Sequence, residues 1–424
     1  MTIVNKWISL KNKVEKAVSA SDSGGSVLTN KVRRSLHAEV ELLRMEWEEK
    51  DYDNSHKYKD QIENILKLLN LRPEKKRNAP IVYWIDVVFR FLGVVAGFIT
   101  LGIVLPIPII VLRMIDHVLL NLGILTPFNL ISGYLRRFLS RFLLVLSGVE
   151  IEVATEDPSS TLCGYFDASC SILTFSHSSN LDGFLVSGTC PIPHYAIAKK
   201  ELFVVPFFSW LSFAIGGVPI DRKNANKAIS AIKDAANTAQ GNKSCLVIAP
   251  EGTRSTTGQL LPFKKGVFYQ WELLKVPIIP FVTYGGYDLY PVGSWVNQCG
   301  KIYVKYLKPI MPEEAKTREE MHRILKRRML LAMMDCPEDV ACPITWSGRL
   351  QNIIATVGIF CLDYFSIEYL HQLLFVELQY NIWMVMAYFT AGSFGITFVL
   401  YVYFVYIVDL MRPRAKVDES KKSS

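Results

Sequence analysis

The residues most suited to chemistry lie in segment 175–183, which reads FSHSSNLDG. A short apolar run precedes it and predicts a strand, whereas its serines and asparagine are typical residues at the start of a helix. We therefore expect His177 in a strand-to-helix turn and Asp182 in the first turns of the helix. Across that turn the carboxylate can bond one imidazole nitrogen, which leaves the other to accept a proton from a hydroxyl group. The alternative hypothesis is a structural histidine at a helix start.

A second segment, 216–222, reads GGVPIDR. Its glycines allow the backbone to approach a ligand closely. Arg222 is suited to bind a phosphate group through two parallel hydrogen bonds. Taken alone, the segment is better explained by a solvated arginine that follows an edge strand.

A third segment, 249–255, reads APEGTRS and directly follows an apolar run that predicts a strand. In α/β folds, ligands bind at the ends of strands. Glu251 can accept a hydrogen bond from a hydroxyl group, Gly252 permits a tight approach and Arg254 can bind phosphate. A fourth segment, 276–280, reads VPIIP and is typical of a buried strand.

The elements that must position these segments alternate between about 148 and 335. Short apolar runs bounded by proline, glycine or charge are followed by helical stretches, and this pattern predicts an α/β domain with a largely buried sheet. The expected strands include 172–175, 195–198, 246–249 and 278–282, and the expected helices are 226–238, 266–274 and 313–335.

A membrane segment is expected before this domain. Residues 91–112 form an uncharged run of 22 residues, more than the roughly 20 that cross a bilayer core. Pro106 and Pro108 should kink or break its helix near the end. A second uncharged run covers 118–135, and basic residues on both flanks favour a hairpin or re-entrant pair with both ends in the cytosol. The flanking basic residues are Lys75, Lys76, Arg77, Arg136, Arg137 and Arg141.

A second membrane segment is expected after the domain. Residues 378–408 are uncharged over 31 positions and predict a span. The apolar stretch 351–376 is interrupted by Asp363, Glu368 and His371, and we expect a second span or an interfacial helix that completes a hairpin. These three residues are expected near headgroups or at a helix–helix interface rather than along a functional path.

The polar amino-terminal region is helix-prone, and we expect a pair of amphipathic helices that pack on the main body or on lipid headgroups. The chain therefore divides into five parts. They are a polar helical region (1–79), a membrane hairpin with an amphipathic helix (80–147), the α/β domain (148–335), a carboxyl-terminal membrane hairpin (336–411) and a basic polar tail (412–424).

Composition and missing motifs exclude several classes of protein. The chain is 50% hydrophobic and 20% charged with a formal net charge of +8, which suits a membrane surface or an anionic substrate. Its eight cysteines form no C-x-x-C pair, so we expect no metal site. The sequence contains neither a G-x-x-x-x-G-K-[ST] nor a G-x-G-x-x-G motif, and its hydrophobic spans argue against a nucleic-acid binder.

In their order and spacing, the four segments resemble the motifs of the glycerolipid acyltransferase superfamily. Its type member is 1-acylglycerol-3-phosphate (lysophosphatidic acid) O-acyltransferase. The N-H-x4-D motif is matched with Ser176 in place of asparagine, and the F-P-E-G-T-R-S motif with Ala249 in place of phenylalanine. The resemblance covers about 148–310. It implies a mixed, largely parallel sheet flanked by helices, and the membrane segments on the amino side are similar in kind to those of the family. The carboxyl-terminal membrane helices are not a general feature of the family and are expected from the uncharged run 378–408.

The resemblance also implies a mechanism. His177 would be the general base for a glycerol hydroxyl that attacks an acyl-CoA thioester, and Asp182 would orient and stabilise the imidazolium. The residues implied to bind the substrate are Arg222, Glu251, Gly252, Thr253 and Arg254. Acyl-CoA would be a co-substrate, with no bound cofactor and no metal. The partners would be acyl-CoA, a lysophospholipid and the bilayer, in an integral membrane protein of the endoplasmic reticulum whose catalytic domain faces the cytosol.

We expect the acceptor to be lysophosphatidic acid, which acylation converts to phosphatidic acid in phospholipid biosynthesis. Glycerol 3-phosphate, lysophosphatidylcholine and a lysocardiolipin-type acceptor are alternatives. A lipase or esterase is the nearest enzymatic competitor, but the chain has no G-x-S-x-G motif. A lipid-binding membrane scaffold with an inactive acyltransferase fold is the alternative that is not an enzyme.

Overall fold

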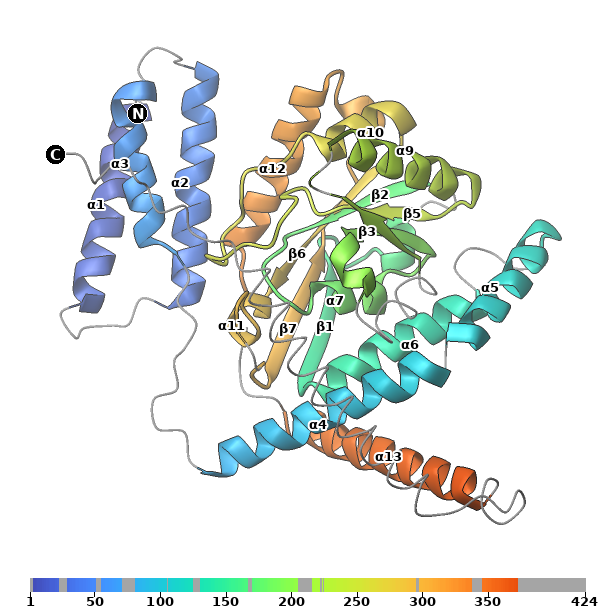
Figure 1. The fold of residues 1–424 in the computed structure, drawn as a ribbon. Helices are drawn as coiled ribbons and strands as arrows, with labels where there is room; N and C mark the ends of the chain where they lie inside the picture. The colour runs from blue at the N-terminus through green and yellow to red at the C-terminus, as the bar shows by residue number, and fades with distance from the viewer. Residues whose placement is uncertain are drawn as a thin grey trace.

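The fold is a central sheet with helices on both faces, a three-helix bundle at the amino end and a second helical group at one edge of the sheet (Figure 1). It is seen in a computed structural model. The structure describes residues 3–22, 29–50, 55–70, 81–104, 106–124, 130–166, 170–204, 216–221, 223, 225–294, 297–337 and 345–372.

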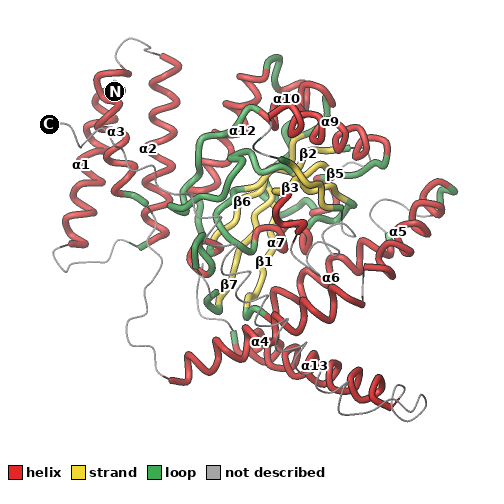
Figure 2. Tube along the Cα trace, viewed as in Figure 1, coloured by secondary structure: helices red, strands yellow, loops and turns green. Residues whose placement is uncertain are grey.

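The sheet has seven strands in the order β1-β7-β6-β2-β5-β3-β4, and they form the centre of the molecule (Figure 2). The strands are β1 Val149–Thr155, β2 Ser171–Phe175, β3 His194–Lys199, β4 Gly217–Ile220, β5 Cys245–Val247, β6 Ile278–Tyr284 and β7 Gly300–Tyr306. All pairs are parallel except β6 with β7. The expected mixed, largely parallel sheet is confirmed.

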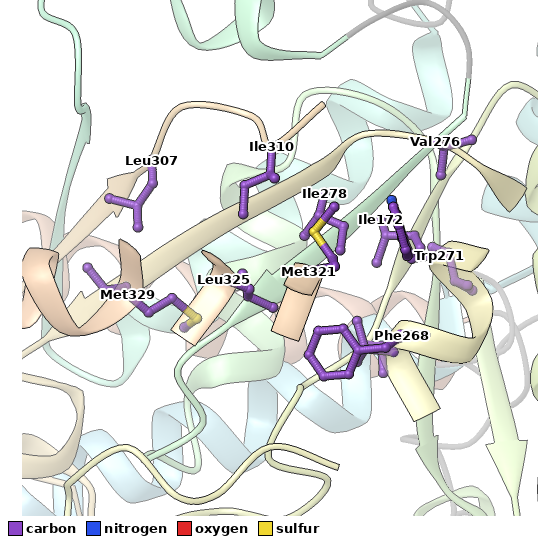
Figure 3. Packing of buried hydrophobic residues seen from close by; sticks show 14 of the residues in the cluster. Ile172, Phe268, Trp271, Val276, Ile278, Leu307, Ile310, Met321, Leu325 and Met329 are labelled. Atoms are coloured by element: carbon purple, nitrogen blue, oxygen red, sulfur yellow. The ribbon is translucent and has the colours of Figure 1, made fainter. Parts of the chain in front are cut away.

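Helices cover the sheet on both faces, and its central strands are buried along their whole length. Every residue of β2, β5 and β6 is buried, as expected for parallel strands covered on both sides. One face carries α9 Ala225–Gly241, α10 Gly266–Leu274 and α12 Arg318–Met334, and the other carries α6 Ile131–Leu146 and α7 Asp182–Thr189. Figure 3 shows Met321 and Leu325 of α12 packed over Ile278.

Four shorter helices lie in the described part of the domain. They are α11 Gly286–Leu289 and the 3-10 helices Leu162–Tyr165, Lys200–Val204 and Pro312–Glu314.

The described residues of the amino-terminal region form three helices, not the expected pair. They are α1 Ile3–Asp22, α2 Asn30–Lys50 and α3 Ser55–Leu68. Helix α1 was not predicted, although its apolar residues Trp7, Leu10 and Val14 recur at helical spacing. These residues pack with Trp47 and Leu69 in a hydrophobic core that belongs to the bundle alone.

The hydrophobic region before the sheet forms two helices, which meet near the prolines that were expected to kink or break it. Helix α4 Ile81–Val104 ends before Pro106, and α5 Pro106–Asn121 begins at this residue, since proline is tolerated in the first turn of a helix. The run 91–112 is therefore not one continuous helix. Part of the run 118–135 lies outside the described residues.

The carboxyl-terminal helix α13 Trp346–His371 packs against α4. Among the described parts of the chain, Trp346–Tyr369 is the one segment that meets the length and hydropathy of a membrane span. A Cβ atom on Gly93 would lie 2.8 Å from Thr356 Cγ2, so the two helices approach closely. Asp363 accepts a hydrogen bond from Thr100, which places it at this helix–helix interface as expected. The predicted span 378–408 lies outside the described residues.

The three arginines of α6, expected only as a basic flank, hold the end of α7. Arg136 is 4% exposed, and its guanidinium group donates hydrogen bonds to several acceptors near the end of α7. Arg136 donates to the carbonyl oxygens of Ser187 (3.3 Å), Cys190 (3.1 Å) and Ile192 (3.0 Å) and to His194 Nδ1. Arg137 and Arg141 each add one bond to a backbone carbonyl oxygen. Because carbonyl groups at a helix end lack partners within the helix, these bonds fix α7 to α6.

We expect Arg136→Met to lower the free energy of unfolding by about 3 kcal/mol, because buried carbonyl groups lose their donor. Urea denaturation in detergent measures the loss. Arg137→Met is the matched control, since the partly exposed Arg137 makes one such bond, to Pro191 O (2.6 Å), and its loss should be within about 1 kcal/mol. Equal losses for the two variants would contradict this role of Arg136.

Candidate active site

The turn between β2 and α7 brings together the two residues predicted for acid–base chemistry. β2 ends at Phe175 and α7 begins at Asp182. His177 Nδ1 lies 2.7 Å from Asp182 Oδ2. The side chain of His177 is 20% exposed and that of Asp182 is fully buried. A carboxylate that accepts from Nδ1 holds the imidazole in the tautomer whose Nε2 can accept a proton.

The carboxylate of Asp182 is itself held by the backbone. Its Oδ2 atom also accepts from the N–H groups of Ser178 and Ser179, each at 2.9 Å. Asp182 is the first residue of α7, where the positive end of the helix dipole stabilises a negative charge. The expectation of a serine or asparagine N-cap is wrong. The N-cap is Leu181, whose side chain makes no cap hydrogen bond.

Glu251 joins this turn to the loop after β5. Its Oε1 accepts from the backbone N–H of His177 at 2.7 Å and its Oε2 from that of Leu261 at 2.8 Å. In return, the N–H of Ser255 donates to the carbonyl oxygen of His177 at 2.6 Å. The two loops meet because β2 and β5 are parallel neighbours whose carboxyl ends share one edge of the sheet. Glu251 thus positions the backbone of His177, while its contact with a substrate stays a prediction.

Burial raises the pKa of Glu251 to about 8, against the two backbone N–H groups, which lower it. The nearby carboxylate of Asp182 raises the pKa further. Desolvation dominates because a carboxylate loses more hydration energy on burial than two amide donors restore. Near pH 7 most of the Glu251 side chains are therefore neutral.

Gly252 is required by the loop that follows Glu251. Its φ of +69° lies in the left-handed region, and a Cβ atom there would lie 2.9 Å from Lys264 Cγ. The turn presents Thr253 to solvent and directs Arg254 back toward the histidine turn.

Arg254 contacts a residue that was expected only as a helix cap. Its guanidinium donates to Asn180 Oδ1, so the predicted phosphate-binding arginine lies beside the His177 turn. Asn180 is thus a site residue that the sequence analysis missed, and its place between His177 and Asp182 was the available signal. Arg222 lies outside the described residues. Among the described residues, no cluster of three or more His, Cys, Asp or Glu side chains could hold a metal ion.

Comparison with known proteins identifies this part of the chain. Residues 152–284 match the family model described as Acyltransferase. A 1-acyl-sn-glycerol-3-phosphate acyltransferase of Cocos nucifera is 36% identical over 149 residues, which are 35% of this chain and 48% of that protein. The Saccharomyces cerevisiae protein of the same name is 36% identical over 144 residues, 34% of this chain and 48% of that protein.

Residues 152–284 belong to the glycerolipid acyltransferase superfamily. The resemblance of the four motifs is confirmed over this acyltransferase domain. The chain spans about half the length of the curated relatives that it matches. A crystal structure of the 1-acyl-sn-glycerophosphate (LPA) acyltransferase from Thermotoga maritima covers 59% of this chain and 97% of its own, with 21% identity and a TM-score of 0.47.

The raised pKa of Glu251 gives the acyltransferase domain a testable pH dependence. The folded protein binds a proton here that the unfolded chain loses above about pH 4.5, so this contribution to stability falls as the pH rises toward 8. Glu251→Gln is less stable at pH 5, because an amide N–H₂ group then faces a backbone N–H. The stability gap should narrow by up to about 1.4 kcal/mol per pH unit between pH 5 and 8.

Urea denaturation across this pH range measures the gap. Glu15→Gln, at a half-exposed side chain of α1, controls for the removal of a carboxylate and should follow the parent chain. A gap that stays constant with pH would show that the pKa of Glu251 is not raised.

Proposed function

We propose that this protein is a membrane-bound, acyl-CoA-dependent O-acyltransferase that converts lysophosphatidic acid to phosphatidic acid. The observation that carries the proposal is the 2.7 Å bond between His177 Nδ1 and the buried carboxylate of Asp182. It supplies an oriented base, and the names of the relatives supply the class of acceptor.

The base acts on the hydroxyl group of the acceptor. As the hydroxyl oxygen attacks the carbonyl carbon of the thioester, His177 Nε2 takes its proton, and the imidazolium is stabilised by Asp182. The C–O ester bond forms, the C–S bond breaks, and the proton passes from the imidazolium to the CoA thiolate. No acyl-enzyme is needed, because the thioester is already activated and the site brings the two substrates together.

The acceptor phosphate is assigned to the loop that carries Arg254. This guanidinium lies beside Asn180, so a phosphate bound there is close to the His177 turn. Thr253 is exposed on the same loop and can donate its hydroxyl group to the phosphate. Gly252 allows the tight turn, and Arg222 remains a proposed second cation.

We expect His177→Ala to retain acceptor binding but to lose turnover by at least about 100-fold, because general base catalysis contributes 10²–10⁴-fold. Purified protein is supplied with labelled acyl-CoA and a panel of lysophosphatidic acid, glycerol 3-phosphate and lysophosphatidylcholine. The acylated lipid is then quantified. His117→Ala, at an exposed histidine of α5, is the control and should leave the rate unchanged.

Product formation that survives in His177→Ala would overturn the mechanism. Free fatty acid without acylated lipid would indicate a hydrolase. A preference for another member of the panel would reassign the acceptor.

The membrane association rests on exposed apolar side chains. Helices α5 and α6 expose Met114 (67%) and Phe138 (63%), and α13 exposes Trp346 (90%) and Phe365 (66%). Apolar surface of this extent is costly in water and stable in lipid. We propose an integral membrane protein of the endoplasmic reticulum with the acyltransferase domain in the cytosol.

We expect the protein to stay in the membrane pellet after a wash in 1 M salt, at which the Debye length is only about 3 Å and charge attraction is screened. Detergent should release it, because apolar contacts hold it. Membrane fractions probed with an antibody give the measurement, and protease added to sealed vesicles reports the side on which the domain lies. Release by salt alone would exclude integral insertion.

A further inference from the structure

The amino-terminal bundle contacts the acyltransferase domain through a buried ion pair. Arg34 of α2 donates to Asp288 Oδ2 of α11, and Asn30 donates to Asp288 Oδ1. The side chains of Arg34 and Asp288 are 4% and 11% exposed. A largely buried carboxylate paired with a cation holds its element in a defined place, because the loss of Arg34 leaves the charge of Asp288 without compensation. Figure 1 shows α11 on the side of the domain nearest to α2.

Helix α11 packs directly on the turn that carries His177. The carbonyl oxygen of Tyr290, just after α11, accepts from the N–H of Asn180 at 3.2 Å and from Ser179 Oγ at 3.1 Å. A Cβ atom on Gly286 would lie 3.2 Å from Ser179 Cβ and 3.9 Å from Asp182 Oδ1. A shift of α11 would therefore move Ser179 and Asn180.

The bundle also reaches the loop that carries Glu251 and Arg254. Gln259 is 4% exposed, and its Nε2 donates to the carbonyl oxygen of Leu69, just after α3, at 2.7 Å. Tyr287 of α11 donates to the carbonyl oxygen of Thr256 at 3.0 Å. Both loops of the site thus rest on the same amino-terminal element.

We propose that the bundle sets the geometry of the acceptor-phosphate site, with Arg34 and Asp288 as positioning residues. The path runs from Asp288 through α11 to Asn180, whose side chain accepts from Arg254. Arg34 and Asp288 both lie outside the region 152–284 that matches the family model. The contact of the bundle with α11 is therefore made outside the matched domain. The inference rests on the proposed function, because it assigns the affected step to acceptor binding.

A second ion pair on the same helix provides a matched control. Glu41 of α2 accepts from Lys326 of α12 at 2.7 Å, and the two side chains are 10% and 16% exposed. This pair joins the bundle to α12, on the sheet face that carries α9 and α10. Lys326→Met therefore weakens bundle docking without touching α11, whereas Arg34→Met removes the ion pair with α11 and leaves the hydrogen bond from Asn30.

The experiment measures initial rates of the full chain in mixed micelles, with lysophosphatidic acid and acyl-CoA varied separately. We expect Arg34→Met and Asp288→Asn to raise KM for lysophosphatidic acid about tenfold, the effect of misplacing one charge-assisted hydrogen bond. The KM for acyl-CoA and kcat should change less than about twofold. Lys326→Met should leave all three constants unchanged, and Arg34→Lys, which keeps the cation, should recover part of the loss.

The double variant Arg34→Met/Asp288→Asn should be no worse than either single variant, because the two residues act as a unit. Melting temperatures identify folded variants, and the isosteric Asp288→Asn tests the proposal if Arg34→Met does not fold. Unchanged KM in folded Arg34→Met and Asp288→Asn, or equal changes in all three constants for these variants and Lys326→Met, would overturn the positioning role. Absence of acylation in the parent chain would instead overturn the proposed function, and this inference with it.

Discussion

The carboxylate of Asp182 is the group on which the site depends. One oxygen accepts from the imidazole of His177 and from two backbone N–H groups of the intervening turn. A carboxylate that starts a helix is favoured by the helix dipole, and among the described residues no lysine or arginine forms a salt bridge with it. The far end of the same helix is held by Arg136 of α6. Both ends of α7 are therefore fixed, and the position of the imidazole follows from them.

Parallel strand pairing explains how His177 and Glu251, which are 74 positions apart in the sequence, meet beside this helix. The turn after β2 and the loop after β5 leave the sheet at the same edge, and Glu251 joins them from within. Its buried carboxyl bonds backbone groups of both segments, which fixes the distance between His177 and the loop that carries Arg254. The amino-terminal bundle then supports that loop and α11 from outside.

The strands of the sheet could be predicted from the sequence because each is a local apolar run. The His177–Asp182 turn could be predicted because its motif has a fixed spacing. The role of Glu251 was not, since its partners are backbone N–H groups that only the folded turn presents. Asn180 and Asp288 make contacts with residues distant in sequence, which no local spacing encodes. In the sequence, the arginines of α6 indicate only the basic flank of a membrane segment. In the structure, Arg136 is buried against α7.

The contact between α4 and α13 has a consequence for the order of folding. Thr100 and Asp363 are 263 residues apart, and the whole acyltransferase domain lies between them in the chain. During synthesis α4 emerges long before its partner helix exists, and domains generally fold as units from the amino end. The pairing of these two helices is consequently among the last steps of assembly. Until then the face of α4 that carries Gly93 lacks its packing partner Thr356.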